Sequence, residues 1–347
     1  MNIALVKLSA IGDVVHALPV AAALHAALPH ARLSWIVERR EAAVLRDHPA
    51  LSEIIPVDTR AWRRARTALA VAGAGGALVT LRRHLRAARF DVAIDLQGLI
   101  KSGMITAATG APLRIGFTRA HCREGLNALF TNRRIAPPPS ARHIVDRYLA
   151  LVEPLGARVS SVEFALPTDG AAETRIDEFL MGAGLKPRDR LVVLNPGAGR
   201  PDKRWPTERF RALARRLSGE AAASVLVTWG PNELADARAI VGADTRGAAA
   251  LAPPTNLDEL LAVLRRASVV VAADTGPLHL AAALGTRCVG LYGPTEAERN
   301  GPYGRGHRSL QSLDATMSSL GVEDVFRATA DLLDGAIAEP SAPEPAR

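Results

Sequence analysis

The amino-acid sequence, 347 residues long, predicts an α/β protein built from two domains with parallel sheets. Short runs of β-branched and other apolar residues are each followed by helical sequence, and this rhythm occurs in both halves of the chain. The chain is also longer than one typical domain of roughly 150 residues. Because alternating strands and helices give parallel sheets with right-handed crossovers, we expect two Rossmann-like domains that face each other across a cleft.

The expected strands are spaced by helical sequence throughout. The first domain begins with a strand and a helix that starts near Val14. The expected strands are Ile3–Leu8, Leu33–Val37, Glu53–Val57 and Val92–Leu96 in the first half, and Leu191–Leu194, Ser224–Trp229, Val269–Ala273 and Cys288–Tyr292 in the second.

The join between the domains is expected near residues 164–190, where a proline and three glycines interrupt the pattern. This predicts one domain over residues 1–167 and a second over 168–338. A closing helix is expected at about 321–337, because apolar residues recur there at helical spacing. The tail 339–347 is rich in Pro, Ala and Glu, and we expect it to be disordered.

Composition excludes several classes of protein. The two cysteines, Cys122 and Cys288, stand far apart and outside any metal-binding pattern, so we expect packed thiols without a zinc site or a disulfide framework. Met1 leads straight into a strand without a signal peptide. The weakly apolar run Ala68–Leu81 is shorter than the roughly 18 residues that a membrane-spanning helix needs. We therefore expect a cytoplasmic protein.

The net charge of +8 is unevenly distributed. Residues 1–167 hold 22 Lys and Arg against 12 Asp and Glu, whereas residues 168–347 hold 21 against 23. A basic half indicates an anionic partner, which could be nucleic acid, a membrane surface or an acidic small molecule. A solubilising excess of arginine would give the same asymmetry. Aromatic content of 4% and the lack of helix-turn-helix or RNP patterns argue against nucleic acid.

Residues 268–285 carry the strongest local signal. A buried strand is expected to end at Asp274-Thr275-Gly276, and an Ala- and Leu-rich helix follows at once. Pro277 suits the first helical position, and Gly276 lets backbone N–H groups approach a ligand. A helix N-terminus of this kind binds phosphate. His279, one turn further on, would either face that phosphate or pack in the interior.

Two further turns follow strands expected in the same sheet. The first, residues 195–206, contains Gly197 and Gly199 together with Lys203 and Arg204, which offer positive charge to phosphate. A solvated basic loop would look similar. In the second turn, Glu233 would either bind ribose hydroxyls or only favour the start of a helix. Asp274 is repelled by a diphosphate unless it binds hydroxyls or orients a cation.

The first turn of the chain, residues 8–16, lacks the G-x-G-x-x-G fingerprint, which argues against a nicotinamide dehydrogenase. Asp13 stands where the first strand becomes a helix, the usual ligand position of open α/β sheets. It would act there as a general base, or it would only cap the helix.

Arginines flank the weakly apolar stretch Ala68–Leu81 on both sides. Arg60, Arg63 and Arg64 precede it, and a second basic group follows it at residues 82–89. Positive charge beside mild hydrophobicity fits contact with an anionic lipid surface. A solvated helix face gives the same pattern, so both interpretations stay open.

Taken together, these segments resemble the bacterial lipopolysaccharide heptosyltransferases, which are family 9 glycosyltransferases of the GT-B fold. Within that family the chain is most similar to the heptosyltransferase I group. The similarity runs from the first strand to about Leu333. The segments that carry it are VKLSAIGDVVHALP at Val6–Pro19, DLQGLIKSG at Asp95–Gly103, CREGLNALFTNRR at Cys122–Arg134, DKRWP at Asp202–Pro206, and ADTGPLHLAAALG with LYGPTE within Ala273–Glu296.

The resemblance implies an inverting transfer of L-glycero-D-manno-heptose from ADP-heptose to the Kdo residue of Kdo-lipid A, at the inner face of the cytoplasmic membrane. Asp13 matches the family's catalytic base. No metal or other cofactor is implied, and no DxD motif stands where one would be needed. The donor-binding matches are Lys203, Glu233, Asp274, Thr275, Gly276 and His279, and the acceptor-binding segments contain Arg60, Arg63, Arg64 and Arg123.

Two alternatives stay open. Heptosyltransferase II, or another family member with a different acceptor or sugar, would share these motifs, and Thr316 stands where many relatives carry cysteine. A nucleotide-sugar epimerase would share the paired Rossmann architecture but would convert its sugar nucleotide without an acceptor.

Overall fold

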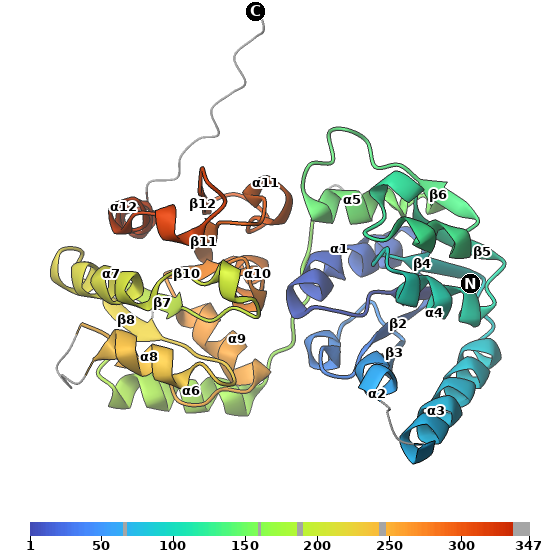
Figure 1. The fold of residues 1–347 in the computed structure, drawn as a ribbon, viewed down its shortest axis with the longest axis horizontal. Coiled ribbons are helices and arrows are strands. Elements are labelled where there is room, and N and C mark those ends of the chain that lie inside the picture. Colours follow the sequence, from blue (N-terminus) through green and yellow to red (C-terminus); the bar gives the residue numbers. More distant parts are fainter. Residues whose placement is uncertain (65–67, 159–160, 186–189, 243–247, 336–347) are drawn as a thin grey trace, which may run out of the picture. The chain divides into compact units, whose positions relative to one another are not determined.

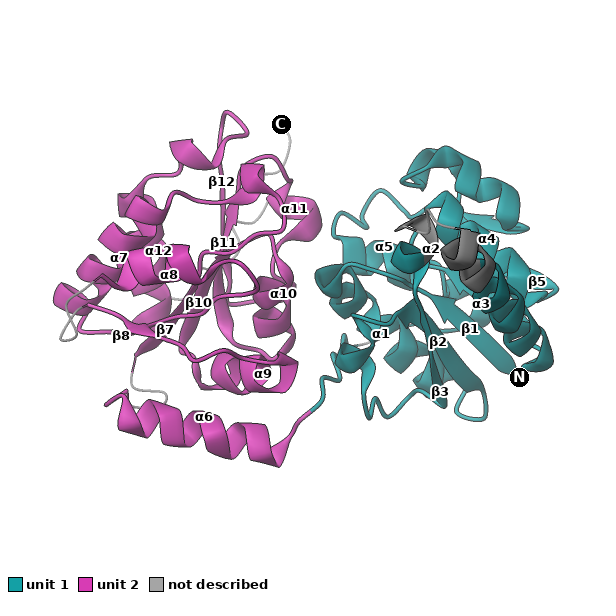
Figure 2. Cartoon of the chain, turned by 60° about the horizontal axis from the view of Figure 1, so that its bottom comes forward, with its two compact units in different colours: residues 1–167 teal, residues 168–347 magenta. Residues whose placement is uncertain are grey.

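The computed structural model describes residues 1–64, 68–158, 161–185, 190–242 and 248–335, without the side chains of 62–64 and 68–74. The chain divides into two compact units, residues 1–167 and 168–347, which Figure 2 colours separately. We call them unit 1 and unit 2. The tail expected to be disordered, 339–347, lies outside the described residues.

Strands form one parallel sheet in each unit (Figure 1). The strands of unit 1 are β1 Asn2–Val6, β2 Arg32–Glu38, β3 Glu53–Val57, β4 Val92–Asp95, β5 Leu113–Phe117 and β6 Arg133–Ile135. Those of unit 2 are β7 Leu191–Asn195, β8 Ser224–Val227, β9 Ala250–Leu251, β10 Val269–Ala273, β11 Arg287–Tyr292 and β12 Arg308–Gln311.

The two sheets have the same topology. Within the described residues, unit 1 is ordered β3-β2-β1-β4-β5-β6, and unit 2, read from its other edge, is ordered β9-β8-β7-β10-β11-β12. Both are therefore doubly wound sheets in which the strand order reverses between the first and the fourth strand. Ligands of such sheets bind at the carboxyl ends of these two strands. The predicted α/β class with Rossmann-like sheets is confirmed.

Helices connect the strands in both units. Those of unit 1 are α1 Ile11–Ala27, η1 Ala42–Leu45, α2 Thr59–Arg64, α3 Ala68–Ala87, α4 Ile100–Thr109, η2 Arg119–His121, η3 Gly125–Phe130, α5 Ile144–Ala150 and η4 Glu153–Leu155. Those of unit 2 are α6 Gly170–Gly182, η5 Pro201–Lys203, α7 Thr207–Gly219, α8 Leu234–Val241, α9 Leu257–Arg266, α10 Gly276–Ala283, α11 Ala297–Asn300, η6 Met317–Ser319 and α12 Val322–Leu333.

Helices cover both faces of each sheet, so the central strands are apolar along their whole length. In unit 1, Ile3, Ala4, Leu5 and Val6 of β1 are all fully buried. Helix α1 packs with α5, whereas α3 packs with α4. In unit 2, α7, α8 and α12 share one core with the sheet, and α9 packs with α6 and α10. Among the described residues, every helix is too short or too polar to span a bilayer.

Helix α6 lies within the segment expected to join the domains. The Asp169 carboxylate caps it by accepting from the Ala172 N–H at 2.8 Å. Ala172, Ile176 and Leu180 recur every four residues and form its buried face. The glycines interpreted as breaks stand at its two ends, where they are tolerated. The boundary between the two units, at residues 167 and 168, lies within this segment.

Trp205 connects the core of unit 2 to the basic loop after β7. Its ring lies 4.8 Å from that of Phe210 in an edge-to-face arrangement, and its indole N–H donates to the Leu320 carbonyl at 3.0 Å. Both rings are almost fully buried. Because Lys203 precedes Trp205 by only two residues, this packing fixes the lysine relative to the sheet.

We expect Phe210→Ala to lower the free energy of unfolding by about 3–5 kcal/mol, because it removes a buried aromatic ring and leaves a cavity. Urea denaturation of the full chain measures this loss. Met181→Ala, at a side chain 74% exposed, is the control and should be close to neutral. Equal effects of the two substitutions would contradict the packing described.

Candidate functional site

Predicted donor residues gather at the carboxyl edge of unit 2. Strands β8, β7 and β10 are neighbours in the sheet, and the turns after them carry Glu233, Lys203 and Asp274. Because the strands are parallel, these turns lie at one edge of the sheet. The expected grouping of the three turns follows from the strand order alone.

Asp274 is the centre of this edge. Lys203 Nζ lies 2.7 Å from Asp274 Oδ2, and His279 Nε2 lies 3.0 Å from Oδ1. The Asp274 side chain is 10% exposed, that of Lys203 is 19% exposed and that of His279 is 4% exposed. Burial on its own would raise the pKa of Asp274, but the hydrogen bonds and charges of His279 and Lys203 hold it well below its ordinary value.

The same turn starts helix α10. Thr275 is the N-cap residue in extended conformation, Gly276 is the first helical residue, and Pro277 is the second. N–H groups in a first helical turn have no partner within the helix, and the macrodipole adds positive potential there. Lys203 Nζ is also 3.5 Å from the Asp274 carbonyl oxygen, directly before this turn. The arrangement therefore suits an anion such as phosphate.

Glu233 joins the two neighbouring loops. It stands immediately before α8, and its Oε2 accepts from the Gly230 N–H at 2.7 Å. A Cβ atom placed on Gly197 would lie 1.9 Å from the same Oε2. Only glycine at 197 therefore leaves room for the carboxylate, so the loop after β7 sets the position of Glu233.

In unit 1, Asp13 lies in the first turn of α1. Its Oδ2 accepts a hydrogen bond from the Ala10 N–H at 3.1 Å, which is the contact expected of a helix-capping aspartate. Two cations also approach it: Lys7 Nζ lies 3.5 Å from Oδ1 and Arg123 Nη1 lies 3.8 Å from Oδ2. The Asp13 side chain is 31% exposed, so the carboxylate is oriented yet still reachable from solvent.

Lys7 was not singled out from the sequence. It is fully buried, and its ammonium donates to the Tyr148 hydroxyl at 2.6 Å and to the Leu96 carbonyl at 3.4 Å. Burial alone would lower the pKa of Lys7, but Asp13 and Tyr148 raise it above its ordinary value. A lysine within an otherwise apolar strand-like run is the sequence signal that could have revealed it.

Asp95, the last residue of β4, fixes the turn that carries Asp13. Its carboxylate accepts from Asn127 Nδ2 at 2.6 Å, from Ser102 Oγ at 2.9 Å and from the Gln97 N–H at 2.9 Å. Burial raises the pKa of Asp95 against the lowering effect of these bonds. The Gln97 side chain then accepts from the Leu8 N–H at 2.9 Å and donates to the Ser9 carbonyl at 2.7 Å. The first turn is therefore held to β4.

The predicted acceptor arginines occupy different places. Arg123 lies beside Asp13 and is 57% exposed. Arg60 lies in α2, with Nη2 4.0 Å from Oε1 of the buried Glu41. Burial raises the pKa of Glu41 above its ordinary value. Arg63 and Arg64 belong to α2, but their side chains lie outside the described part of the structure.

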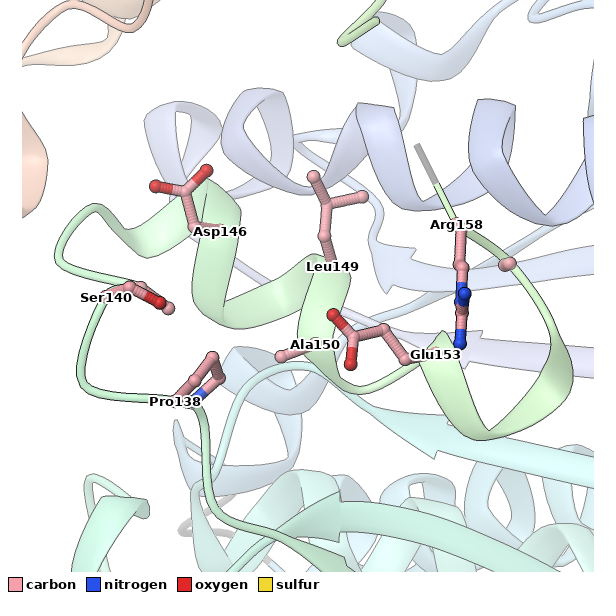
Figure 3. A pocket seen from close by; sticks show the side chains of 9 residues that line it. Pro138, Ser140, Asp146, Leu149, Ala150, Glu153 and Arg158 are labelled. Carbon is pink, nitrogen blue, oxygen red and sulfur yellow. The ribbon is translucent and has the colours of Figure 1, made fainter. Parts of the chain in front are cut away.

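A cavity of about 540 Å³ lies beside α5 in unit 1 (Figure 3). Its lining includes Ser140, Asp146, Glu153 and Arg158, and it includes none of the predicted site residues. Its size alone would make it a candidate site. The charged clusters at the strand ends are instead the places where oriented polar groups converge.

Comparison with known proteins agrees with these motifs. Residues 78–328 match the model of glycosyltransferase family 9 (heptosyltransferase). The chain is 32% identical to lipopolysaccharide heptosyltransferase 1 of Pseudomonas aeruginosa, over 90% of this chain and 84% of the relative. It is 30% identical to lipopolysaccharide heptosyltransferase 1 of Salmonella typhimurium, over 94% and 99%. The solved structure of E. coli heptosyltransferase WaaC with ADP superposes with a TM-score of 0.78 at 28% identity, over 96% of this chain and 100% of that one.

The Asp274 cluster makes stability depend on pH. Since the folded state holds the pKa of Asp274 below its unfolded value of about 3.9, its contribution is complete above about pH 5 and is lost progressively as pH falls below that. We expect Asp274→Asn to lower the free energy of unfolding by about 2 kcal/mol at pH 7. The difference from the unsubstituted protein should shrink below about pH 4 in urea titrations.

Asp202→Asn is the control for this prediction, because Asp202 pairs with Arg200 on the surface and is 48% exposed. It should change stability little. A difference between Asp274→Asn and the unsubstituted protein that stayed constant down to pH 2 would contradict the role assigned to His279 and Lys203.

Proposed function

Because this chain belongs to glycosyltransferase family 9 (heptosyltransferase), we propose that it transfers L-glycero-D-manno-heptose, with inversion, from ADP-heptose to the Kdo residue of Kdo-lipid A. It is a glycosyltransferase by family. The observation that carries the proposal is the cluster of Lys203, Asp274 and His279 beside the start of α10, which provides positive charge and helix N–H groups for a diphosphate.

In this proposal unit 2 binds the donor. Lys203 has three N–H donors, so it can keep its bond to Asp274 and still bind a phosphate oxygen. The amides of Thr275 and Gly276 bind the same diphosphate. Lys203 balances the negative charge of Asp274, which would otherwise repel the ligand, and His279 is within hydrogen-bonding distance of the same carboxylate. Glu233, held by Gly230, accepts hydrogen bonds from the ribose hydroxyls.

Unit 1 supplies the base and binds the acceptor. Asp13 removes the proton from the Kdo hydroxyl, and the hydroxyl oxygen attacks the anomeric carbon from the face opposite ADP. The bond between the anomeric carbon and the phosphate oxygen breaks, and its electron pair leaves with ADP. Arg123, together with Arg60, Arg63 and Arg64, would bind the acidic acceptor, in agreement with the excess of positive charge in residues 1–167.

We also propose that no metal takes part and that the enzyme works in the cytoplasm at the inner membrane surface. Lys203 and the α10 amides take the place of a cation at the developing ADP charge. The acceptor is a lipid, so the basic unit has to approach a membrane.

The direct test is to incubate the purified protein with ADP-heptose and Kdo₂-lipid A, with and without EDTA. We expect ADP release only when acceptor is present, one added heptose of inverted anomeric configuration by mass spectrometry and NMR, and no effect of EDTA. Conversion of ADP-heptose without acceptor would indicate an epimerase. Transfer only to an acceptor that already carries heptose would indicate heptosyltransferase II.

Asp13→Asn should lower kcat about 10²- to 10⁴-fold, because the amide cannot accept the acceptor proton but can still accept the Ala10 N–H. Steady-state kinetics measure this, and a cooperative thermal transition shows that the variant is folded. Asp47→Asn, at a surface carboxylate 83% exposed, is the matched control. Retention of normal kcat in the Asp13 variant would remove this residue from the mechanism.

Gly197→Ala should weaken ADP binding about tenfold, because its methyl group would occupy the place of the Glu233 carboxylate and displace it. The displaced group is the end of a flexible side chain, so we expect little loss of stability. Calorimetric titration with ADP measures the affinity. Gly199→Ala is the control, since a Cβ at 199 meets no atom within 4 Å. Equal affinities in the two variants would argue against ribose binding by Glu233.

A further inference from the structure

We propose that unit 1 docks on anionic lipid bilayers through an exposed apolar face formed by Met104, Leu126 and Leu129. We call these three side chains the apolar face. The inference rests on the proposed function, because it names the surface by which the enzyme reaches a lipid acceptor. The partner that binds this face is the bilayer itself.

Exposure first sets these residues apart. The Met104 side chain is 58% exposed, Leu126 is 52% exposed and Leu129 is 73% exposed. A single exposed leucine is ordinary on a protein surface. Here, however, the three belong to two elements that pack on one another, α4 and η3. A Cβ on Gly103 would lie 2.5 Å from the Phe130 ring, so the backbone of α4 directly before Met104 touches η3.

The geometry of η3 directs both leucines outward. In a 3₁₀-helix, residues three apart stand on the same face, so Leu126 and Leu129 project together. Asn127 and Ala128 are buried on the opposite side. Asn127 Nδ2 is bound to Asp95 Oδ2 at 2.6 Å and to the Leu99 carbonyl at 2.7 Å. Since the inward side is already filled, the leucines cannot turn into the core.

Three arginines contact η3, the element that carries the two leucines. Arg134 Nε donates to the Ala128 carbonyl at 2.9 Å, and Arg114 Nε donates to the Phe130 carbonyl at 2.9 Å. The Cγ of Arg119 lies 3.1 Å from a Cβ built on Gly125. The nearby acid Glu124 is engaged by the Ile100 N–H at 2.6 Å. In peripheral membrane binding, apolar side chains typically enter the boundary of the acyl chains. Neighbouring cations contact the phosphate headgroups.

The apolar face adjoins the proposed catalytic edge. Arg123, two residues before η3, approaches Asp13 at 3.8 Å, and the Glu124 N–H donates to the Gly98 carbonyl at 2.9 Å. The segment that leads into η3 therefore contacts the turn after β4 and approaches the first turn of α1, which carries Asp13. A bilayer bound at this face would bring its lipid headgroups to the side of unit 1 where the acceptor is needed.

The test measures binding of the full chain to vesicles, without donor or acceptor. Vesicles of equal parts phosphatidylglycerol and phosphatidylcholine should bind the protein in flotation assays, and binding should fall as salt rises. Leu126→Ser with Leu129→Ser should weaken binding about tenfold. The matched control is Met181→Ser with Leu313→Ser, which removes two exposed apolar side chains from unit 2 and should leave binding unchanged.

Equal vesicle binding by the two double variants, or no binding by the unsubstituted protein, would overturn the proposal. Self-association of the unsubstituted protein in sedimentation velocity would also overturn it, if the unit 1 double variant lost that association and the control did not. The apolar face would then bind a second copy of the chain. Turnover separates this proposal from the proposed function. The unit 1 variant should slow transfer to Kdo₂-lipid A in vesicles but not to the acceptor stripped of its acyl chains. If no heptose is transferred at all but the leucine substitutions still weaken vesicle binding, the proposed function is wrong and the docking surface is supported.

Discussion

Lys203 and His279 reach the Asp274 carboxylate from two different elements of unit 2, at 2.7 and 3.0 Å. A largely buried charge is costly unless it is paired and hydrogen-bonded, so this contact fixes the end of β10, the loop after β7 and the start of α10 relative to one another. The positions of Lys203, His279 and the Thr275 and Gly276 amides depend on it. Removing either partner would leave Asp274 underpaired at the place where a diphosphate has to bind.

Unit 1 has a carboxylate at the same topological position, with a different environment. Asp95 ends β4, the fourth strand of its sheet, as Asp274 follows β10, the fourth strand of the other. Asp95 accepts from neutral donors and its pKa is raised, whereas Asp274 is bound by Lys203 and His279 and its pKa is lowered. The first arrangement stiffens a turn that presents Asp13. The second keeps positive groups ready for an anion, so one fold provides two different functions.

The sequence predicted long, fully apolar strands well, and β3 and β10 have the expected bounds. Strands β5, β6, β9 and β12 were missed. β6 and β9 are too short to carry a periodic signal, and they form only because a neighbouring strand of the sheet pairs with them. Asp13, Lys203 and Asp274 could be identified because each follows a predicted strand. Asp95 and Gln97 could not, because their roles depend on contacts with distant segments, such as Asp95 with Asn127 and Gln97 with Leu8. Lys7 interrupts an apolar run, but its contact with Tyr148 appears only in the folded structure.

The proposed function requires that unit 2 presents a preformed diphosphate site at the carboxyl end of β10. A crystal structure of the protein with ADP tests this most directly. We predict that the diphosphate lies within hydrogen-bonding distance of Lys203 Nζ and of the Thr275 and Gly276 amides, with Asp274 still bound to Lys203 and His279. ADP bound in the cavity beside α5, or anywhere that leaves Lys203 and the start of α10 without contact to phosphate, would contradict the account.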